Sequence, residues 1–445
     1  VNWDADVDVS LKSNIATFSL EQVAIRGCLV LYFKQILPRP PFFTGLRIYF
    51  ADPPPRVALR LVLQSLGQTV SSAWLEDLLS EAILRALMAK LMLPNVASIL
   101  LDINDEEAWF QVGRVLPDGL LQVHVREAVD LAARDCGLPF GLSEPNSDPY
   151  CKLTIGGISW KTTTKPRTLS PKWSAREGKH SFLVHSVSDQ SLDLEVFDED
   201  PYKDDEFLGA RTVGLEDMVA AGSMQLELLG EGAQGTLHVS SRYAPFVLDE
   251  TVLRLQLART MSTQKSDAEQ RSPDDIAFII FVGVDQCLLP EPADGASVAG
   301  GYMCEVRCGE EKDVLSSRAS RARGYYGAGW VDNSESPELL DSEGEVDAGA
   351  GTESASREVN FQSVVTRLLR GDPRQWKLIL RVTYTTYGIF RELGSAELDA
   401  SRLVYAPMNT ERIKLRLGGD GSDAPCLDVL AQMRVTQPGV SAPIV

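Results

Sequence analysis

The alternation of apolar and polar residues along this chain predicts strands far more often than helices. Near the start, "IATFSLEQVAIRGCLVLYFKQI" and "GLRIYF" alternate or run apolar at strand length, and "ADPPPR" interrupts them. Large apolar residues then recur at helical spacing in "SSAWLEDLLSEAILRALMAKLMLPN", which Ser71 or Ser72 can cap and Pro94 ends. We therefore predict a curved or open sheet with one apolar helix over residues 1–110.

Two further blocks are predicted from strand spacing. Residues 116–242 contain short strand-like segments with a turn every ten to fifteen residues, a pattern typical of an antiparallel β-sandwich. A polar linker follows, and residues 276–436 repeat the same order of strands, beginning with "DIAFIIFVGVDQCLL". The third block is therefore interpreted as a weakly preserved internal repeat of the second.

Charge and cysteine content narrow the class of protein. The formal net charge of −19 argues against a nucleic-acid partner. Part of the excess acid lies in a segment rich in acid, Ser and Gly at about 331–358, which we expect to be a disordered insertion or solvated loop. The seven cysteines are scattered without a zinc-binding pattern, which favours free thiols in the cytosol.

The most informative stretch is "VFDEDPYKDDEFLG" (196–209), which places six carboxylates in one loop. Calcium binds six to eight hard oxygens at about 2.3–2.6 Å, and Asp198 and Asp200 alternate as two such ligands would. The spacing is not that of an EF-hand, because Lys203 and Gly209 occupy the positions that need Gly and Glu. A second loop carries Asp135 and Asp148, and the two loops can meet at one end of a sandwich.

These motifs resemble a known family. "NSDPYCKLTIG", "TLSPKW", "LDLEVFDEDPYKDDEFLG" and "GTLHVSSRY", in this order, resemble a calcium-binding C2 domain. "FFTGLRIYF" and "LLSEAILRALMAKLMLPN", which run straight into it, resemble the later half of an SMP domain. That combination is similar to the extended synaptotagmins, tricalbins and plant synaptotagmins.

The resemblance implies a mainly β fold: a partial, TULIP-like SMP domain with a curved antiparallel sheet plus helix, followed by two C2 β-sandwiches. The implied domains are the SMP part at 1–110, a C2 domain with a calcium site at 112–245, a linker at 246–275 and a degenerate C2-like domain at 276–436. In the last domain Gly301, Tyr384 and Thr386 stand where the second block has Asp148, Asp198 and Asp200, so it is expected not to hold calcium.

The resemblance also implies a set of calcium ligands. They are Asp135, Asp148, Asp198, Asp200 and a last acid that is either Asp205 or Glu206, depending on which C2 loop length is counted. The alternative is an acidic solvated loop on a C2 domain that does not bind calcium.

Two further sets of residues are candidates for contact with a membrane. Leu138, Phe140 and Tyr202 lie at loop tips where they can insert into lipid, although ordinary loop packing is the alternative. The basic stretch "WKTTTKPRTLSPKW" can face anionic headgroups or be a solvated strand; its cations are Lys161, Lys165, Arg167 and Lys172.

The first block has large side chains on both faces of its strands, which a lone sheet with one helix cannot cover. One face is therefore expected to line a groove for acyl tails, unless a compact core is completed by further chain. Strand parity gives one candidate set, with the opposite parity open: Leu29, Leu31, Phe33, Leu46, Ile48 and Phe50.

The expected function is a calcium-responsive protein that tethers apposed membranes and transfers glycerolipids between them. Its expected partners are anionic phospholipid membranes, glycerolipid cargo and a second copy of the chain in an SMP-mediated homodimer. The resemblance implies a location on the cytoplasmic face of membranes, at contacts of the endoplasmic reticulum with the plasma membrane. The membrane anchor that this location implies is not visible in this chain. The alternative is a tether that binds phospholipid without transporting it. An enzyme is not expected, because GxSxG, HRD and P-loop patterns are lacking.

Overall fold

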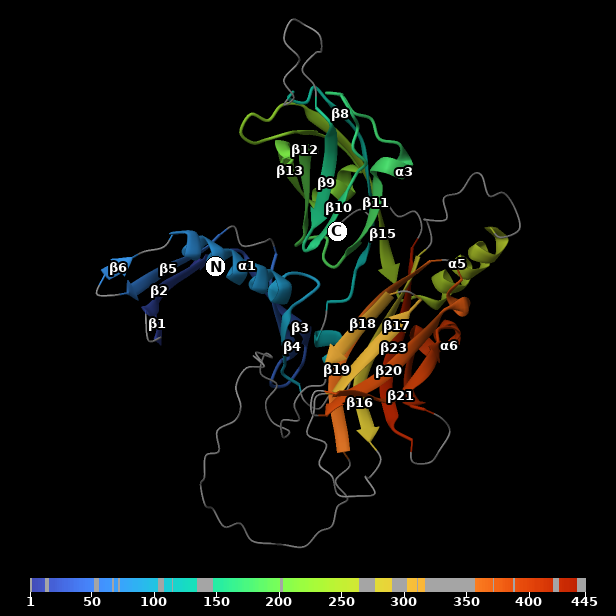
Figure 1. Cartoon of the computed structure of the whole chain (residues 1–445). Helices are drawn as coiled ribbons and strands as arrows, with labels where there is room; N and C mark the ends of the chain where they lie inside the picture. Colours follow the sequence, from blue (N-terminus) through green and yellow to red (C-terminus); the bar gives the residue numbers. More distant parts are fainter. Residues whose placement is uncertain are drawn as a thin grey trace, which may run out of the picture.

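The structure is a computed structural model of the chain (Figure 1). It describes the following residues: 2–12, 16–51, 56–65, 68–70, 73–102, 108–113, 115–133, 147–200, 203–263, 277–289, 302–309, 311–316, 357–370, 372–386, 389–418 and 424–437. The predicted caps Ser71 and Ser72 and residues 331–356 of the acidic segment lie outside these ranges.

The first block contains two antiparallel sheets and a long helix. One sheet has the order β1–β2–β5–β6 and the other β3–β4–β7. The bounds of their strands are β1 (Asn2–Lys12), β2 (Ala16–Arg26), β3 (Leu29–Ile36), β4 (Phe43–Phe50), β5 (Arg56–Ser65), β6 (Gln68–Val70) and β7 (Ala97–Leu100). Helix α1 (Ala73–Leu91) packs on β5 and ends before Pro94, as its apolar spacing predicted.

The second block is a sandwich of two sheets. One has the order β10–β9–β12–β13; in the other, β8 lies between β11 and β15, and β14 pairs with β15. Its strands are β8 (Gly119–Val129), β9 (Pro149–Ile155), β10 (Ile158–Lys161), β11 (Lys179–Val184), β12 (Ser191–Asp198), β13 (Glu206–Gly214), β14 (Ser223–Glu227) and β15 (Thr236–Val247). Two short helices, α3 (Ala175–Gly178) and α4 (Leu215–Ala221), join strands. Along β12, Leu192, Leu194 and Val196 alternate with less buried residues and enter the core.

The third block repeats this arrangement. Sheet β18–β17–β20–β21 faces the sheet in which β16 lies between β19 and β23, and β22 pairs with β23. Its strands are β16 (Ala277–Leu289), β17 (Tyr302–Cys308), β18 (Glu311–Ser316), β19 (Arg357–Arg370), β20 (Lys377–Thr386), β21 (Ile389–Asp399), β22 (Thr410–Arg416) and β23 (Cys426–Thr436). Its helical elements are η3 (Pro373–Gln375), α6 (Ser401–Tyr405) and η4 (Pro407–Asn409).

Part of the segment expected to be a linker is folded. Helix α5 (Glu250–Thr263) begins where the side chain of Asp249 accepts hydrogen bonds from Thr251 N and Val252 N. Leu253 and Leu257 of α5 are buried in the core of the third block. Their spacing of four residues places both on one helix face, so α5 belongs to that sandwich.

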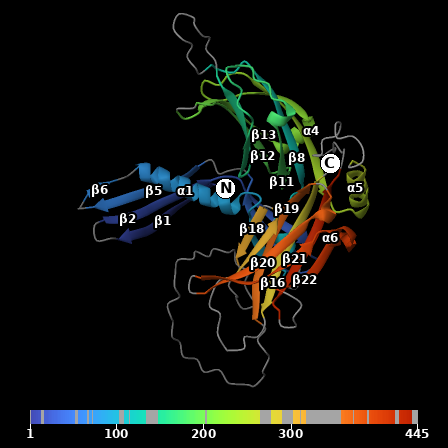
Figure 2. The same ribbon diagram turned by 45° about the vertical axis from the view of Figure 1, so that its right-hand side comes forward.

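The two sandwiches share one continuous sheet (Figures 1 and 2). The last residues of β15, Phe246 and Val247, pair with Thr436 and Val435 of β23, which gives the order β11–β8–β15–β23–β16–β19. Each of these pairings is antiparallel, so β8 and β16 run in opposite directions. The last residues of β8 and β16 therefore lie at opposite ends of the sheet.

Candidate functional site

The described ends of the two acidic loops of the second block, at Asp148 and Asp198, are in contact. Strand β12 ends at Asp198, whose carboxylate is only 1% exposed and accepts a hydrogen bond from Asp148 N at 2.5 Å. Glu199 N in turn donates to Asp148 O at 3.0 Å. Since a buried carboxylate is costly without compensation, this backbone bond stabilises the charge of Asp198 at the base of the loops.

The described residues between β12 and β13 are held together by hydrogen bonds and ion pairs among themselves. Asp205 Oδ1 accepts a hydrogen bond from Asp200 N at 3.2 Å, and Asp205 Oδ2 accepts one from the Tyr150 hydroxyl at 2.7 Å. Lys203 Nζ lies 3.0 Å from Asp200 Oδ2 and also pairs with Glu206 Oε1. These pairs with Glu206 and Asp200 raise the pKa of Lys203. A single ammonium thus bridges two of the predicted ligands.

These residues fit a hard divalent cation by the chemistry of their oxygens. Carboxylates are the ligands that calcium prefers, and the ammonium of Lys203 stands in for a cation among them. Within the described part of the chain, no three acidic, histidine or cysteine side chains converge closely enough to hold a metal ion. The predicted ligand Asp135 lies outside the described residues.

The last ligand remains a choice between two acids. Asp205 reaches back to Asp200 N, whereas Glu206 is the direct cross-strand partner of Asp198 in the β12–β13 register. Directly opposed residues of antiparallel strands project to the same face. Both acids are therefore near the loop base, and the assignment stays a prediction.

The basic stretch is held by acids of the same sandwich. Lys161 pairs with Glu199 at 3.3 Å, Lys165 with Glu177 at 2.7 Å and Lys172 with Glu127 at 3.0 Å. Arg167 pairs with none of the carboxylates that the structure describes, and its backbone N donates to Asp148 Oδ1. The headgroup role of these cations remains a prediction; the side chains of Lys172 and Lys161 are 78% and 58% exposed, whereas that of Lys165 is 25% exposed.

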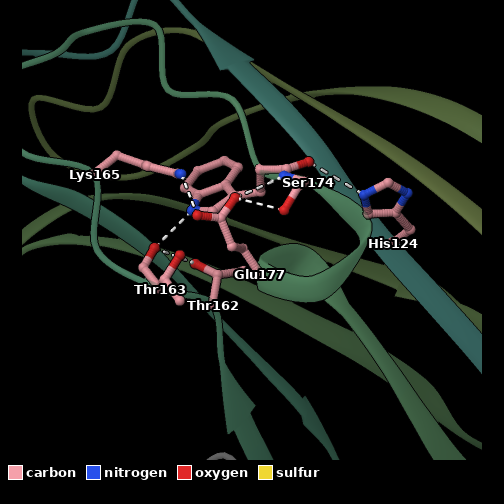
Figure 3. Close-up of polar contacts among 7 residues, drawn as sticks. His124, Thr162, Thr163, Lys165, Ser174 and Glu177 are labelled. Carbon is pink, nitrogen blue, oxygen red and sulfur yellow. Dashed lines mark hydrogen bonds and ion pairs between the residues drawn. The ribbon is translucent and has the colours of Figure 1, made fainter.

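Figure 3 shows that Glu177 of α3 forms hydrogen bonds with Lys165 of the basic stretch and with Ser174, just after it. Glu177 Oε2 accepts hydrogen bonds from Ser174 N and Ser174 Oγ, while its other oxygen accepts Lys165 Nζ. The Trp173 indole donates to Thr163 O at 2.6 Å. Lys165 and Ser174 together lower the pKa of Glu177 to about 2. Lys165 therefore has a structural partner as well as a position on the basic stretch.

In the sandwich of the third block, other residues occupy the positions equivalent to the acidic site. In the second block Val196 pairs with Cys151, two residues before Asp198; in the third, Val382 pairs with Cys304, two residues before Tyr384. Tyr384 thus takes the strand position of Asp198, and its ring lies 5.9 Å from that of Tyr302. An aromatic ring supplies no carboxylate oxygen there. Gly301 lies outside the described residues, as do the insertion candidates Leu138, Phe140 and Tyr202.

The six groove candidates of the first block form three cross-strand pairs: Leu29 with Phe50, Leu31 with Ile48, and Phe33 with Leu46. They share one face of the β3–β4 hairpin because paired residues project together. Leu31 and Phe33 are 54% and 49% exposed, whereas Phe50 is buried. The opposite face carries Arg47 and Tyr49, which bond to the rest of the protein. This arrangement favours the predicted parity, and the groove role stays a prediction.

Comparison with known proteins identifies the class. Residues 119–229 match the C2 domain family, so the second block contains a C2 domain. The chain is 32% identical over 215 residues to extended synaptotagmin-3 of Xenopus tropicalis, an alignment that covers 48% of this chain and 23% of that relative. Its fold is similar to a solved structure of extended synaptotagmin 2 that contains the SMP domain and two C2 domains, A and B. The TM-score is 0.59 at 16% identity, over 98% of this chain and 82% of that one.

A structure of the two C2 domains of extended synaptotagmin 2 alone, described as calcium bound, is also similar. Its TM-score is 0.51 at 19% identity, over 73% of this chain and 99% of that one. The chain is a homologue of the extended synaptotagmins, and the predicted mainly β fold of a curled sheet followed by C2 sandwiches is confirmed. It spans less than a third of the length of the curated relatives it matches.

Proposed function

We propose that this protein binds anionic membranes through its second block in response to calcium, tethers two apposed membranes and transfers glycerolipid between them. The observation that carries the proposal is the acidic end of the C2 sandwich. There Asp148 and Asp198 are joined by a hydrogen bond, and Asp200 and Asp205 lie in the same folded segment. The division into an SMP part at 1–110, a C2 domain at 112–245 and a C2-like domain at 276–436 is part of this proposal, with α5 of the expected linker packed into the last of them.

The residues that would hold calcium are Asp148, Asp198 and Asp200, with Asp205 or Glu206 and with Asp135. Bound calcium supplies positive charge and coordination positions that a lipid phosphate can complete. The loop end carries like charges that are only partly balanced by Lys203. Neutralising them would let this end approach a negatively charged membrane.

Transfer is supported by the exposed apolar face of the β3–β4 hairpin, to which we assign the acyl tails. The tether role is supported by the antiparallel course of β8 and β16, which sends the ends of the two sandwiches in opposite directions. We place this action at contacts of the endoplasmic reticulum with the plasma membrane. No helix of the described residues is long and apolar enough to cross a membrane.

The test uses the full chain with donor and acceptor liposomes, of which the acceptors contain phosphatidylserine. Calcium should increase liposome clustering and the transfer of a fluorescent glycerolipid. The double substitution Asp198→Asn with Asp200→Asn should remove the calcium effect on both. Clustering without transfer would leave the tether function alone, and calcium-independent clustering in both proteins would refute the calcium site.

A further inference from the structure

The short helix α2 (Ala108–Val112), between the first and second blocks, is almost entirely buried. Ala108, Trp109, Phe110 and Val112 are 2%, 6%, 4% and 1% exposed. A helix of this length is unstable alone, because isolated helices below roughly 12 residues are marginal in water. Its neighbours must therefore hold it in place.

The two aromatic residues of α2 contact the third block, far away in the sequence. Trp109 and Phe110 pack edge to face, with ring centroids 5.9 Å apart. They form one cluster with Ile279 and Phe281 of β16, both 0% exposed. Leu120 and Phe246 of the second block belong to the same cluster. Each sandwich thus contributes apolar residues to a core outside its own interior.

Strand β16 is buried on both faces for this reason. Phe278, Ile280 and Val282 point into the core of the third block's sandwich, whereas Ile279 and Phe281 point toward α2. Gly283 continues the outer row. A Cβ at this position would lie 2.5 Å from Phe110 Cδ2 and 2.8 Å from Trp109 Cη2. The missing side chain of Gly283 therefore leaves the space in which the two rings sit.

The other end of α2 is held by the first block. Arg47 Nε of β4 donates to Val112 O at 3.1 Å, and its Nη2 donates to Gln111 O. These carbonyls belong to the last turn of the helix, where cationic donors are favourable. Gly45 makes room for Val112, since a Cβ there would lie 2.5 Å from Val112 Cγ1.

A further bond joins the first and second blocks. The Tyr49 hydroxyl of β4 donates to Asp189 Oδ2, in the loop between β11 and β12, at 2.9 Å. Within the third block, Gln256 Nε2 of α5 donates to Thr436 O at 3.1 Å, next to the β15–β23 pairing that joins the two sandwiches. The first block therefore contacts the sandwich of the second block directly, and it contacts the sandwich of the third block through α2.

We propose that α2 is a rigid joint, in which Trp109 and Phe110 seated against Gly283 fix the first block to both sandwiches so that the three move as one body. This goes beyond calcium binding and lipid transfer, and it holds whether or not either occurs. Strand β8 begins at this joint and its 11 residues span about 35 Å. Asp148 and Asp198 thus lie at the end of the second sandwich that is remote from the first block, at a fixed separation from it.

Hydrogen exchange of the full chain, followed by mass spectrometry, tests the joint. Peptides covering residues 108–113 should exchange at least a hundredfold more slowly than free peptide. Gly283→Val should remove that protection although it lies in β16, because its side chain would occupy the space of the rings. The double substitution Trp109→Ala with Phe110→Ala should do the same, while peptides from β9 and β12 stay protected in both variants.

Trp109→Phe is the matched control, since Trp109 Nε1 donates to no acceptor that the structure describes and the ring keeps most of its apolar volume. It should retain the protection. Unchanged exchange of 108–113 in Gly283→Val would overturn the proposal. If the variants fail to fold, the wild-type protein decides: rapid exchange of 108–113, or small-angle scattering that requires several orientations of the first block, would refute a rigid joint.

Discussion

Lys203 places its ammonium 3.0 Å from Asp200 Oδ2, inside the acidic segment that joins β12 to β13. The same ammonium pairs with Glu206, so a cation of the protein already lies among the carboxylates proposed to hold calcium. Incoming calcium must compete with it. Exposed ion pairs contribute little because water screens their charges, and the side chain of Lys203 is 56% exposed. Lys203→Gln should therefore lower the calcium Kd by about 1.5- to 5-fold, as measured by isothermal titration calorimetry.

Lys152→Gln is the matched control for that measurement. Lys152 also pairs with an acid at 3.0 Å, but its partner Glu195 lies within β12, away from the loop. It should leave the Kd unchanged. A weaker calcium affinity in Lys203→Gln would mean that Lys203 organises the site rather than competing for it.

The second prediction concerns which sandwich responds to calcium. A ligand that binds only the folded state raises stability by about 2.7 kcal/mol at a hundredfold excess over Kd. In the full chain, millimolar calcium should raise the melting temperature, and Asp198→Asn with Asp200→Asn should abolish the shift. Since Tyr384 occupies the strand position of Asp198 in the third sandwich, no shift should remain. A residual shift in the double variant would show that the third sandwich binds calcium too.

The acidic site illustrates how far sequence can go. Asp148 and Asp198 could be placed together because each follows from strand order in a recognisable sandwich, and the structure joins them by a hydrogen bond. The role of Lys203 was missed, since a lysine among acids looks like ordinary charge alternation until its ammonium is located. The partners of Lys165 and Lys172 were missed because Glu177 and Glu127 lie in a different helix and strand.

The contacts of α2 could not be predicted from the sequence, for another reason. Trp109 and Phe110 occupy only one helical turn, and their contacts in β16 lie about 170 residues further on, a separation that local patterns do not encode. One signal was present: "AFIIFVGV" is apolar at every position but one rather than alternating, as in strands buried on both faces. The β15–β23 pairing rests on two residue pairs, too few to leave a pattern.

The third prediction is a pH dependence at α3. Lys165 and Ser174 hold the pKa of Glu177 down at about 2, below the value of roughly 4.3 expected for an unfolded glutamate. A carboxyl group whose pKa is lower in the folded state than in the unfolded state stabilises the fold at any pH above its unfolded-state pKa. This contribution is lost as the pH falls toward the pKa of the folded state. The melting temperature of wild type should therefore exceed that of Glu177→Gln at pH 6, and the difference should shrink between pH 4.5 and 2. A difference between wild type and Glu177→Gln that stays constant down to pH 2 would contradict the assignment.

The fourth prediction separates members of the basic stretch. Near an anionic membrane each exposed cation contributes about 1 kcal/mol, or roughly fivefold in affinity. Arg167→Gln and Lys172→Gln should each weaken binding to phosphatidylserine liposomes by about that factor at low salt. Lys165→Gln should have a smaller effect, because its side chain is 25% exposed and its ammonium contacts Glu177. Liposome flotation over a salt series measures this, and equal losses for all three would indicate a diffuse electrostatic attraction.

The last prediction concerns the exposed apolar face of the β3–β4 hairpin in the first block. Leu31 and Phe33 are about half exposed on the face of β3 that pairs with Ile48 and Leu46. Leu31→Glu with Phe33→Glu should leave the fold intact, since the added charges can reach water. Acyl tails on that face would have to desolvate the carboxylates, which costs several kcal/mol, so fluorescent lipid transfer should fall by more than tenfold. Tyr32→Glu is the matched control, because Tyr32 is 46% exposed on the opposite face of the same strand. Native mass spectrometry should find copurified lipid on wild type and on Tyr32→Glu but not on the double variant. Equal transfer by all three proteins would remove this face from the transport path and leave the tether function in its place.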